Sequence, residues 1–323
     1  RVVQYFAQWA VYSRNFSPAD MALDKITHVH YAFFDVDSSC SVRSLDTYAD
    51  YEKRYNVGGT TAVGALQAFR MLRTQHPHLV LAYSLGGWTK SRNFSPCARD
   101  PALRAKLVQE SVELLTAIDF DGIDVDWEYP VCCGVGSNQV GPDDWTNYLA
   151  LLTEMRAALD AASPGVHKEL TIAMGMSPSV TGVAPMAELA AVLDAVNLMT
   201  YDYNGGWLDY TAHNAPLRAD SAYEAAGGDA RFNIEWGVRE WLKEVPGSKL
   251  VMGLPAYGRS WTQVTGGEYL PAIGAAPEDS GRGTASGATW EKGVVSWWDL
   301  EANYLGKPGW TRGFNAVSEV PYL

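Results

Sequence analysis

Apolar side chains recur along the chain with two periods that alternate. Short runs rich in β-branched and aromatic residues, typical of buried strands, alternate with segments whose apolar residues return every three or four positions, typical of helices. The runs predict strands at residues 2–6, 26–34, 79–85, 120–130, 170–174, 196–201 and 250–254. The periodic segments predict helices at residues 60–74, 101–118, 143–163, 186–193 and 234–242.

This alternation predicts the fold class. Seven strands, each followed by a helix or an insertion, imply a parallel sheet, and a chain of 323 residues suggests an α/β fold of the (β/α)8 TIM barrel type. After residue 257 the chain becomes rich in small residues and proline, with a short strand at 294–298 and a helical turn at 300–305. We therefore expect a barrel domain over residues 1–257 and a small α+β insertion after strand seven, over residues 258–323. No eighth strand follows in the sequence, so we expect further residues after Leu323 to supply it.

Three acids share one side of the predicted strand at 120–130. Asp124, Asp126 and Glu128 alternate with apolar residues that suit a buried strand, which argues against a solvated acidic face. A calcium loop is also disfavoured, because Tyr129 and Val135 stand where the EF-hand pattern needs Gly and Glu. Burying three carboxylates costs several kcal/mol unless they share protons and hydrogen bonds. The row therefore indicates catalysis rather than stability.

Composition and charge exclude some partners. The formal net charge is −12 with a pI of about 4.9, and no cluster of Lys and Arg is present, so binding to nucleic acid is not expected. No apolar run approaches the ~20 residues that a membrane span needs. The 12 Trp and 17 Tyr exceed what a core requires, and they suit a ligand with flat apolar faces and many hydroxyl groups.

The spacings of cysteines and histidines indicate neither a metal site nor a redox pair. Cys40, Cys97, Cys132 and Cys133 show no C-x-x-C spacing and permit three complete pairings. Neighbouring cysteines are strained partners, so we expect Cys132 and Cys133 to pair outward or to stay free. The pairs His28-x-His30 and His76-x-His78 lack a third ligand, so no metal site is expected. The start at Arg1, one residue before an apolar strand and without a signal peptide, suggests a processed or trimmed terminus.

Four motifs together resemble glycoside hydrolase family 18, and specifically its microbial chitinases. They are residues 121–130 (DGIDVDWEYP), 84–88 (SLGGW), 199–203 (MTYDY) and 253–259 (GLPAYGR), and they occur in family order. The segment after Arg259 is similar to the α+β domain that chitinases of the deep-groove subfamily insert after strand seven. The resemblance implies a secreted, monomeric chitinase without a cofactor. Its substrate would be chitin or chitooligosaccharides, cut at β-1,4 bonds between N-acetylglucosamine units.

Glycoside cleavage explains the order of the three acids. The reaction needs an acid for the leaving oxygen and a group that holds the positive charge at the anomeric carbon. Glu128 stands at the strand end and is the predicted acid, whereas Asp124 and Asp126 lie deeper and are badly placed to attack the sugar. The resemblance implies that the N-acetyl carbonyl of the substrate attacks instead and forms an oxazolinium ion. Three neighbouring carboxyl groups titrate together, which we expect to keep Glu128 protonated near neutral pH.

The resemblance also assigns supporting roles. Asp126 would hydrogen-bond the acetamido nitrogen, Tyr201 would donate its hydroxyl to the acetamido oxygen, and Asp202 and Arg259 would position the sugar. Met199 shares a strand face with Tyr201, so we expect both to face the same interior. Aromatic rings would stack on the sugars; the alternative is that they only pack within the fold. The first candidates for stacking are Trp88, Trp207 and Tyr5, and the weaker ones are Trp9, Trp261, Trp297 and Trp298.

Two other functions stay open. A non-catalytic chitin-binding lectin of the same fold would typically lack the acid, and this chain keeps Glu128. An endo-β-N-acetylglucosaminidase acting on N-glycan cores is disfavoured by the insertion, which deepens the groove for a linear polymer. Endo action, exo action and direction along the chitin chain are not distinguished by the sequence.

Overall fold

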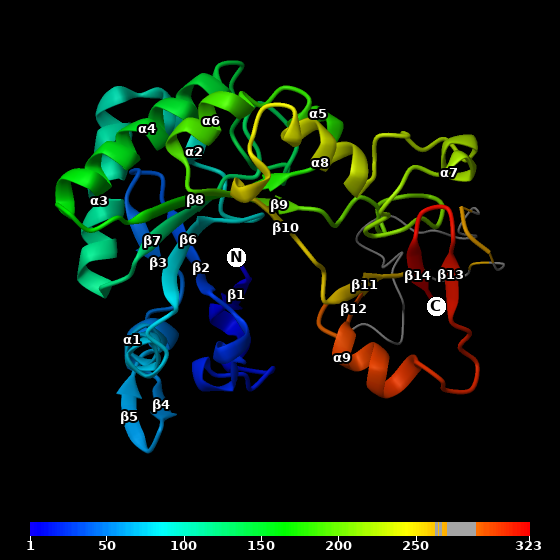
Figure 1. Cartoon of the computed structure of the whole chain (residues 1–323), viewed down its shortest axis with the longest axis horizontal. Helices are drawn as coiled ribbons and strands as arrows, with labels where there is room; N and C mark the ends of the chain where they lie inside the picture. The colour runs from blue at the N-terminus through cyan, green and yellow to red at the C-terminus, as the bar shows by residue number, and fades with distance from the viewer. Residues whose placement is uncertain (262–263, 265–266, 270–288) are drawn as a thin grey trace. The chain divides into compact units, whose positions relative to one another are not determined.

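A sheet of consecutive strands forms the frame of the molecule. The structure, a computed structural model, describes residues 1–261, 264, 267–269 and 289–323. Within them the main sheet has the order β1-β2-β6-β7-β8-β9-β10, and the register shows β1, β2, β6, β7 and β8 to be parallel (Figure 1). These strands are Val3–Ala7, His28–Val36, Val80–Gly86, Gly122–Asp126, Glu169–Gly175, Ala195–Met199 and Leu250–Met252. The predicted α/β fold of the TIM-barrel type, with seven consecutive strands, is confirmed, and closure by an eighth strand stays a prediction.

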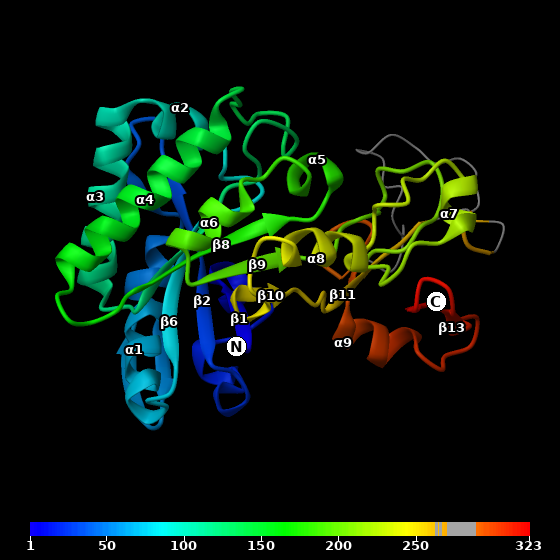
Figure 2. The same ribbon diagram turned by 45° about the horizontal axis from the view of Figure 1, so that its top comes forward.

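Helices cover one face of this sheet. Figures 1 and 2 show α3, α4 and α6 side by side, and α4 contacts both of the others. Helix α3 begins where the Asp100 carboxylate accepts the N–H groups of Ala102 and Leu103, and it ends at Asp119 in the left-handed conformation. The helices of this part of the chain are α1 (Ala65–Gln75), α2 (Phe94–Arg99), α3 (Pro101–Ile118), α4 (Asp144–Ala162) and α6 (Met186–Val192).

Several predicted boundaries were wrong. Residues 60–63, predicted as the start of a helix, form strand β5 (Thr60–Val63), which pairs with β4 (Arg54–Val57). Its β-branched residues favour a strand, and the helix begins only after Gly64, whose φ is +84°. Predicted strands also end earlier, at Asp126, Met199 and Met252. Trp297, predicted in a strand, begins a helical turn, α9 (Trp297–Asp299).

The chain divides into two compact units that alternate along the sequence. The first comprises Arg1–Met174, Ala184–Asn197 and Gly247–Val251, and the second comprises Gly175–Val183, Leu198–Pro246 and Met252–Leu323. The domain boundary predicted at residue 257 stays a prediction. Much of the expected insertion, residues 262–263, 265–266 and 270–288, lies outside the described residues.

The second unit is built from short elements joined by polar contacts. Asn315 donates to Asp220 (3.0 Å) and to Glu268 (2.5 Å), while His213 pairs with Glu268 (2.9 Å) and Tyr269 donates to Asp220 (2.9 Å). These contacts tie three distant segments together. The elements of this unit are α5 (Pro178–Thr181), α7 (Ser221–Ala225), α8 (Ile234–Leu242), β11 (Tyr257–Arg259), β12 (Val294–Ser296), α9, a π-helical turn (Leu300–Tyr304), β13 (Gly313–Asn315) and β14 (Val320–Tyr322).

The described cysteines form disulfides. Cys40, in the loop between β2 and β3 (Val42–Ser44), is bonded to Cys97 of α2. Cys132 is bonded to its neighbour Cys133, so the expectation that these two pair outward or stay free was wrong. Left-handed conformations at Val131 (φ +64°) and Cys133 (φ +60°) turn the chain sharply here, which brings the adjacent side chains together.

Finally, none of the helices in the described part of the chain is long and apolar enough to cross a bilayer.

Candidate active site

The three acids lie in the most buried part of the sheet. Asp124 and Asp126 are on β7, and Glu128 follows two residues after the strand ends. Their exposed fractions are 0%, 4% and 8%. The neighbouring Trp127 is buried against Phe94, with ring centroids 5.4 Å apart, and against Tyr148, at 5.0 Å. This packing fixes the strand end, so the acids occupy defined positions in a site with little water.

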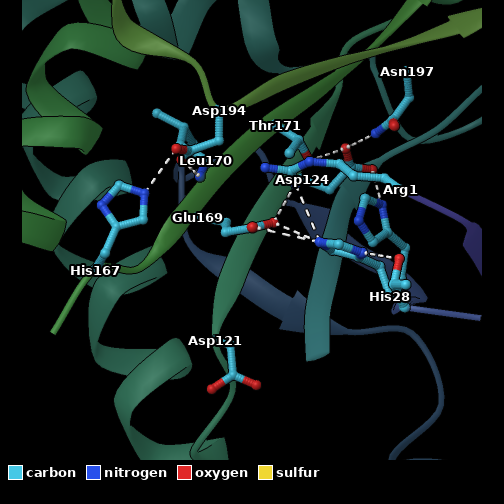
Figure 3. Close-up of polar contacts among 12 residues, drawn as sticks. Arg1, His28, Asp121, Asp124, His167, Glu169, Leu170, Thr171, Asp194 and Asn197 are labelled. Carbon is cyan, nitrogen blue, oxygen red and sulfur yellow. Dashed lines mark hydrogen bonds and ion pairs between the residues drawn. The ribbon is translucent and has the colours of Figure 1, made fainter. Parts of the chain in front are cut away.

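Asp124 is held as a carboxylate. Burial raises its pKa, but the charge of His30 and the hydrogen bonds to the carboxylate outweigh burial and lower the pKa to about 2. Asp124 is therefore ionised at neutral pH. Figure 3 shows two of the side chains that bind it, Thr171 and Asn197. Within the described residues, its Oδ1 accepts from Thr171 Oγ1 (2.6 Å) and Asn197 Nδ2 (3.0 Å), and its Oδ2 accepts from the hydroxyls of Tyr5 (2.8 Å) and Ser84 (2.8 Å).

Asp126 has the opposite preference. Burial, followed by the charges of Glu128 and Asp124, raises the pKa of Asp126 well above its usual value. Its Oδ1 is buried and has no hydrogen-bond partner among the residues that the structure describes. Asp126 therefore keeps its proton to a higher pH than an ordinary aspartate does. The pKa values of the two aspartates are shifted in opposite directions although the residues share a strand face, which supports the prediction that the row titrates as a coupled set.

The backbone of Glu128 is anchored on both sides. Its N–H donates to Ser91 Oγ (2.7 Å), and Ser91 in turn donates to the carbonyl of Gly87 (2.9 Å). The carbonyl of Glu128 accepts from Asn138 Nδ2 (2.7 Å). The protonation state predicted for Glu128 stays a prediction, but its backbone is fixed by loops on two sides.

Gly86, at the end of β6, lets the backbone lie close to β7, the strand that carries Asp124 and Asp126. Its φ is +110°, and a Cβ there would lie 2.3 Å from the backbone oxygen of Asp126 and 2.7 Å from the ring of Phe94. We expect Gly86→Ala to lower the free energy of unfolding by about 3 kcal/mol or more. Gly59→Ala is the matched control, because Gly59 also has a positive φ (+85°) but nothing within 4 Å of its Cβ. Thermal unfolding of both variants checks this, and equal losses of stability would argue against the clash.

A second polar group lies in the second unit. Asp202 Oδ1 accepts from Tyr257 Oη (2.8 Å) and from Arg259 Nε (2.9 Å). The guanidinium of Arg259 lies 5.1 Å from the centre of the Trp207 ring, close enough for a cation–π contact. The ring of Tyr201 meets Tyr257 edge-on at 6.2 Å. Four predicted site residues from three places in the sequence are thus neighbours: Tyr201, Asp202, Trp207 and Arg259.

The carboxylate row belongs to the first unit, and Met199, Tyr201, Asp202, Trp207 and Arg259 belong to the second. The expectation that the two groups face one interior stays a prediction.

A comparison with protein families shows which family the chain is related to. The family model described as glycosyl hydrolases family 18 matches residues 1–323. The chain belongs to this family.

Curated relatives of this family 18 chain are named chitinases. Chitinase A1 of Niallia circulans is 36% identical over 363 aligned residues, which cover 100% of this chain and 51% of the relative. Chitinase 1 of Aphanocladium album is 37% identical and is matched over 92% of this chain and 67% of its own length. The chain thus spans only about half to two thirds of these relatives.

Solved structures agree on the fold. Chitinase ChiA74 from Bacillus thuringiensis superposes with a TM-score of 0.88 at 31% identity, covering 99% of this chain and 59% of that structure. The catalytic domain of chitinase B from Arthrobacter TAD20 gives a TM-score of 0.87 at 26% identity, covering 98% and 82%.

In this family 18 chain, sequence reasoning missed the side chains around Asp124. Ser84, Thr171 and Asn197 were not selected as site residues. The signal lies in strand register: Asp124 stands opposite Ser84 on one side and opposite Thr171 on the other. Register between distant strands is not visible in one sequence, so their contact with Asp124 could not be predicted.

Tyr257 was also missed. It alternates with Arg259 on β11, so the two share a strand face, and this period-two signal was available in the sequence. Burial and the charge of Asp202 raise the pKa of Tyr257, so its hydroxyl stays a donor to Asp202. The cluster thus contains one residue of the 253–259 motif that was not selected as a site residue.

The predicted sugar-stacking residues lie in different surroundings. Trp88 and Trp207 are 50% and 41% exposed, as a ligand platform requires. Tyr5 is part-buried, and its hydroxyl is engaged by Asp124. Its position is better suited to supporting Asp124 than to stacking on a sugar.

In the described part of the chain, no group of three or more His, Cys, Asp and Glu side chains is arranged to bind a metal ion.

Proposed function

We propose that this family 18 chain carries the catalytic domain of a chitinase. It would hydrolyse β-1,4 links between N-acetylglucosamine units in chitin or chitooligosaccharides. The observation that carries the proposal is the buried carboxyl row, in which the pKa of Asp124 is lowered, that of Asp126 is raised, and Glu128 stands at the end. The relatives named chitinases support it, as does a variant of Ostrinia furnacalis Group II chitinase catalytic domain 2, 27% identical, solved in complex with penta-N-acetylchitooctaose, (NAG)5.

The charge states of the aspartates argue for a substrate-assisted mechanism. A retaining glycosidase of the usual kind needs a second carboxylate that is free to attack the sugar. Asp124 is fully buried and each of its oxygens already accepts two hydrogen bonds, while Asp126 favours its protonated form, which is a poor nucleophile. The nucleophile is therefore expected to come from the substrate.

In the proposed reaction, Glu128 gives its proton to the glycosidic oxygen as the bond from that oxygen to the anomeric carbon breaks. The oxygen of the substrate's N-acetyl group bonds to the anomeric carbon and forms an oxazolinium ion, with Asp126 beside the acetamido nitrogen. Glu128 then takes a proton from a water molecule, whose oxygen bonds to the anomeric carbon as the bond from that carbon to the N-acetyl oxygen breaks. This step restores the acid and the N-acetyl group and retains the configuration.

The second cluster would hold the sugar. Tyr201 would donate to the acetamido oxygen, and Asp202 with Arg259 would position the ring. The ion pair of Asp202 with Arg259 (2.8 Å) and the contact of Arg259 with Trp207 support this role, because they leave a polar edge beside an exposed aromatic face. Trp88 and Trp207 would stack on the apolar faces of pyranose rings, with Met199 beside them.

We further propose that the protein is secreted, acts as a monomer and needs no cofactor. The disulfide between the buried Cys40 and Cys97 supports an oxidising compartment. The net charge of −12 disfavours nucleic acid and anionic membrane surfaces as partners.

Turnover of chitotetraose and of a high-mannose glycopeptide tests the function. We expect the first to be cleaved, with the β-anomer as the initial product, and the second to be left intact. Cleavage of the glycopeptide alone would instead identify an endo-β-N-acetylglucosaminidase. Tight binding of chitotetraose without turnover would identify a lectin. The same products, followed with longer oligomers, distinguish endo from exo action.

A further inference from the structure

We propose that His30 is a positioning residue of this site: from β2, which β6 separates from β7, it holds Asp124 in the charged form and so keeps the exchangeable proton of the row on Asp126. The catalytic consequence rests on the proposed function. The pairing of His30 with Asp124 does not, so the two can be tested separately.

The geometry is that of a buried ion pair. His30 is 1% exposed, and its Nδ1 lies 3.4 Å from Asp124 Oδ2. The ring of Tyr5 packs edge-on against the imidazole at 4.9 Å, and Tyr5 stands directly opposite His30 in the pairing of β1 with β2. Because the backbone register and an aromatic neighbour fix the ring, its distance from Asp124 is set by the sheet rather than by a flexible side chain.

In this proposal, the contribution of His30 is a positive charge. A carboxylate offers about four acceptor positions. In the described part of the chain, neutral donors supply four hydrogen bonds to Asp124 without His30. In the described residues, the polar contact of the His30 ring is that of Nδ1 with Asp124 Oδ2 (3.4 Å), and Nε2 has no hydrogen-bond partner. An imidazolium facing a carboxylate gives a reason for its burial.

Of the titratable groups near His30, Asp124 is the one with which it pairs. The strands on either side of β2 contribute Tyr5, whose hydroxyl binds Asp124, and Ser84, which does not titrate. His28 lies two residues earlier on the same strand and pairs with Glu169 (3.2 Å), which also binds Arg1 (Figure 3). The other acids of the row are Asp126 and Glu128. Among all these groups, the ion pair of His30 is with Asp124.

This pairing explains the unequal charges on the row. A positive charge beside Asp124 favours its ionised form, and the low pKa of Asp124 agrees with that. An ionised Asp124 then raises the pKa of Asp126, which retains a proton next to Glu128. Without the charge of His30, Asp124 and Asp126 would compete for the same proton on more equal terms.

His30→Asn tests the inference, because asparagine keeps a small polar side chain but cannot carry a charge. We expect the acid limb of the pH profile of kcat/KM for chitotetraose to move upward by about one pH unit, since a row without the nearby cation binds protons more tightly. His28→Asn is the matched control: it removes a histidine from the same strand and the same face, paired with Glu169 instead. An unmoved acid limb in His30→Asn, or an equal shift in both variants, would overturn the proposal.

The ring nitrogens of histidine in the intact wild-type chain give a second measurement, which does not depend on activity. In 15N NMR spectra recorded from pH 4 to pH 8, the His30 signal is identified by its absence in the His30→Asn variant or, if that variant does not fold, in His30→Gln. We expect an imidazolium at pH 5. A neutral His30 ring at pH 5 would overturn the proposal even if chitotetraose is cleaved. If His30 is an imidazolium but the protein does not cleave chitotetraose, the proposed function is wrong and the ion pair is still supported.

Discussion

Glu128→Gln is expected to lower kcat/KM for chitotetraose by about 10²-fold or more while leaving binding nearly unchanged. Glutamine has the shape of a protonated glutamate, so it keeps the contacts of the side chain but has no proton to give to the leaving oxygen. The backbone of residue 128 is fixed by Ser91 and Asn138, so the substitution does not displace the loop. Initial rates and calorimetric titration with chitotetraose measure the two quantities.

Glu113→Gln is the control, because it makes the same chemical change on the exposed side of α3. This variant should behave as the wild type. Activity of Glu128→Gln within about tenfold of wild type would show that another group supplies the proton. Loss of binding together with activity would show that Glu128 supports the structure of the site instead.

The fold and the acids were predictable because their signals are local. Alternation of apolar runs with helical periods gave the strand order, and the alternation within residues 122–128 put Asp124, Asp126 and Glu128 on one side. Both signals need only the neighbouring residues in the chain. The buried position of the three acids then followed from the apolar residues between them.

What could not be predicted depends on contacts between distant segments. Ser84, Thr171 and Asn197 meet Asp124 only through the register of separate strands, and the sequence around each of them does not show that contact. The bond between Cys132 and Cys133 depends on left-handed conformations that the sequence does not reveal. The early strand at residues 60–63 shows the same limit, since pairing with β4 overrode the helical pattern.

The division of charge within the row is a further property that the sequence does not contain. Alternation predicts three equivalent acids, yet the pKa of Asp124 is low and that of Asp126 is high. The difference arises because donors and an imidazole surround Asp124, whereas an oxygen of Asp126 is buried without a partner in the described residues. The side chains around each position on the strand therefore decide whether the pKa of its aspartate is lowered or raised.

Asp126→Asn is expected to lower kcat/KM for chitotetraose by about 10²-fold or more and to move the alkaline limb of its pH profile to lower pH. Asparagine imitates the neutral Asp126 in size and polarity, so the fold and the hydrogen bonds around Asp124 should persist. It cannot become an anion, however. The row then contains one negative charge fewer at high pH, so its last proton leaves more readily.

The pH profile makes this prediction specific to charge rather than to shape. A purely structural role for Asp126 would lower the rate at every pH and leave the limbs in place, whereas the coupled row requires the alkaline limb to shift. The prediction would fail if Asp126→Asn kept the alkaline limb of the wild type. Asp160→Asn, which makes the same change at an exposed position of α4, should alter neither the rate nor the profile, because among the described residues its carboxylate pairs with Arg156 and with none of the three acids.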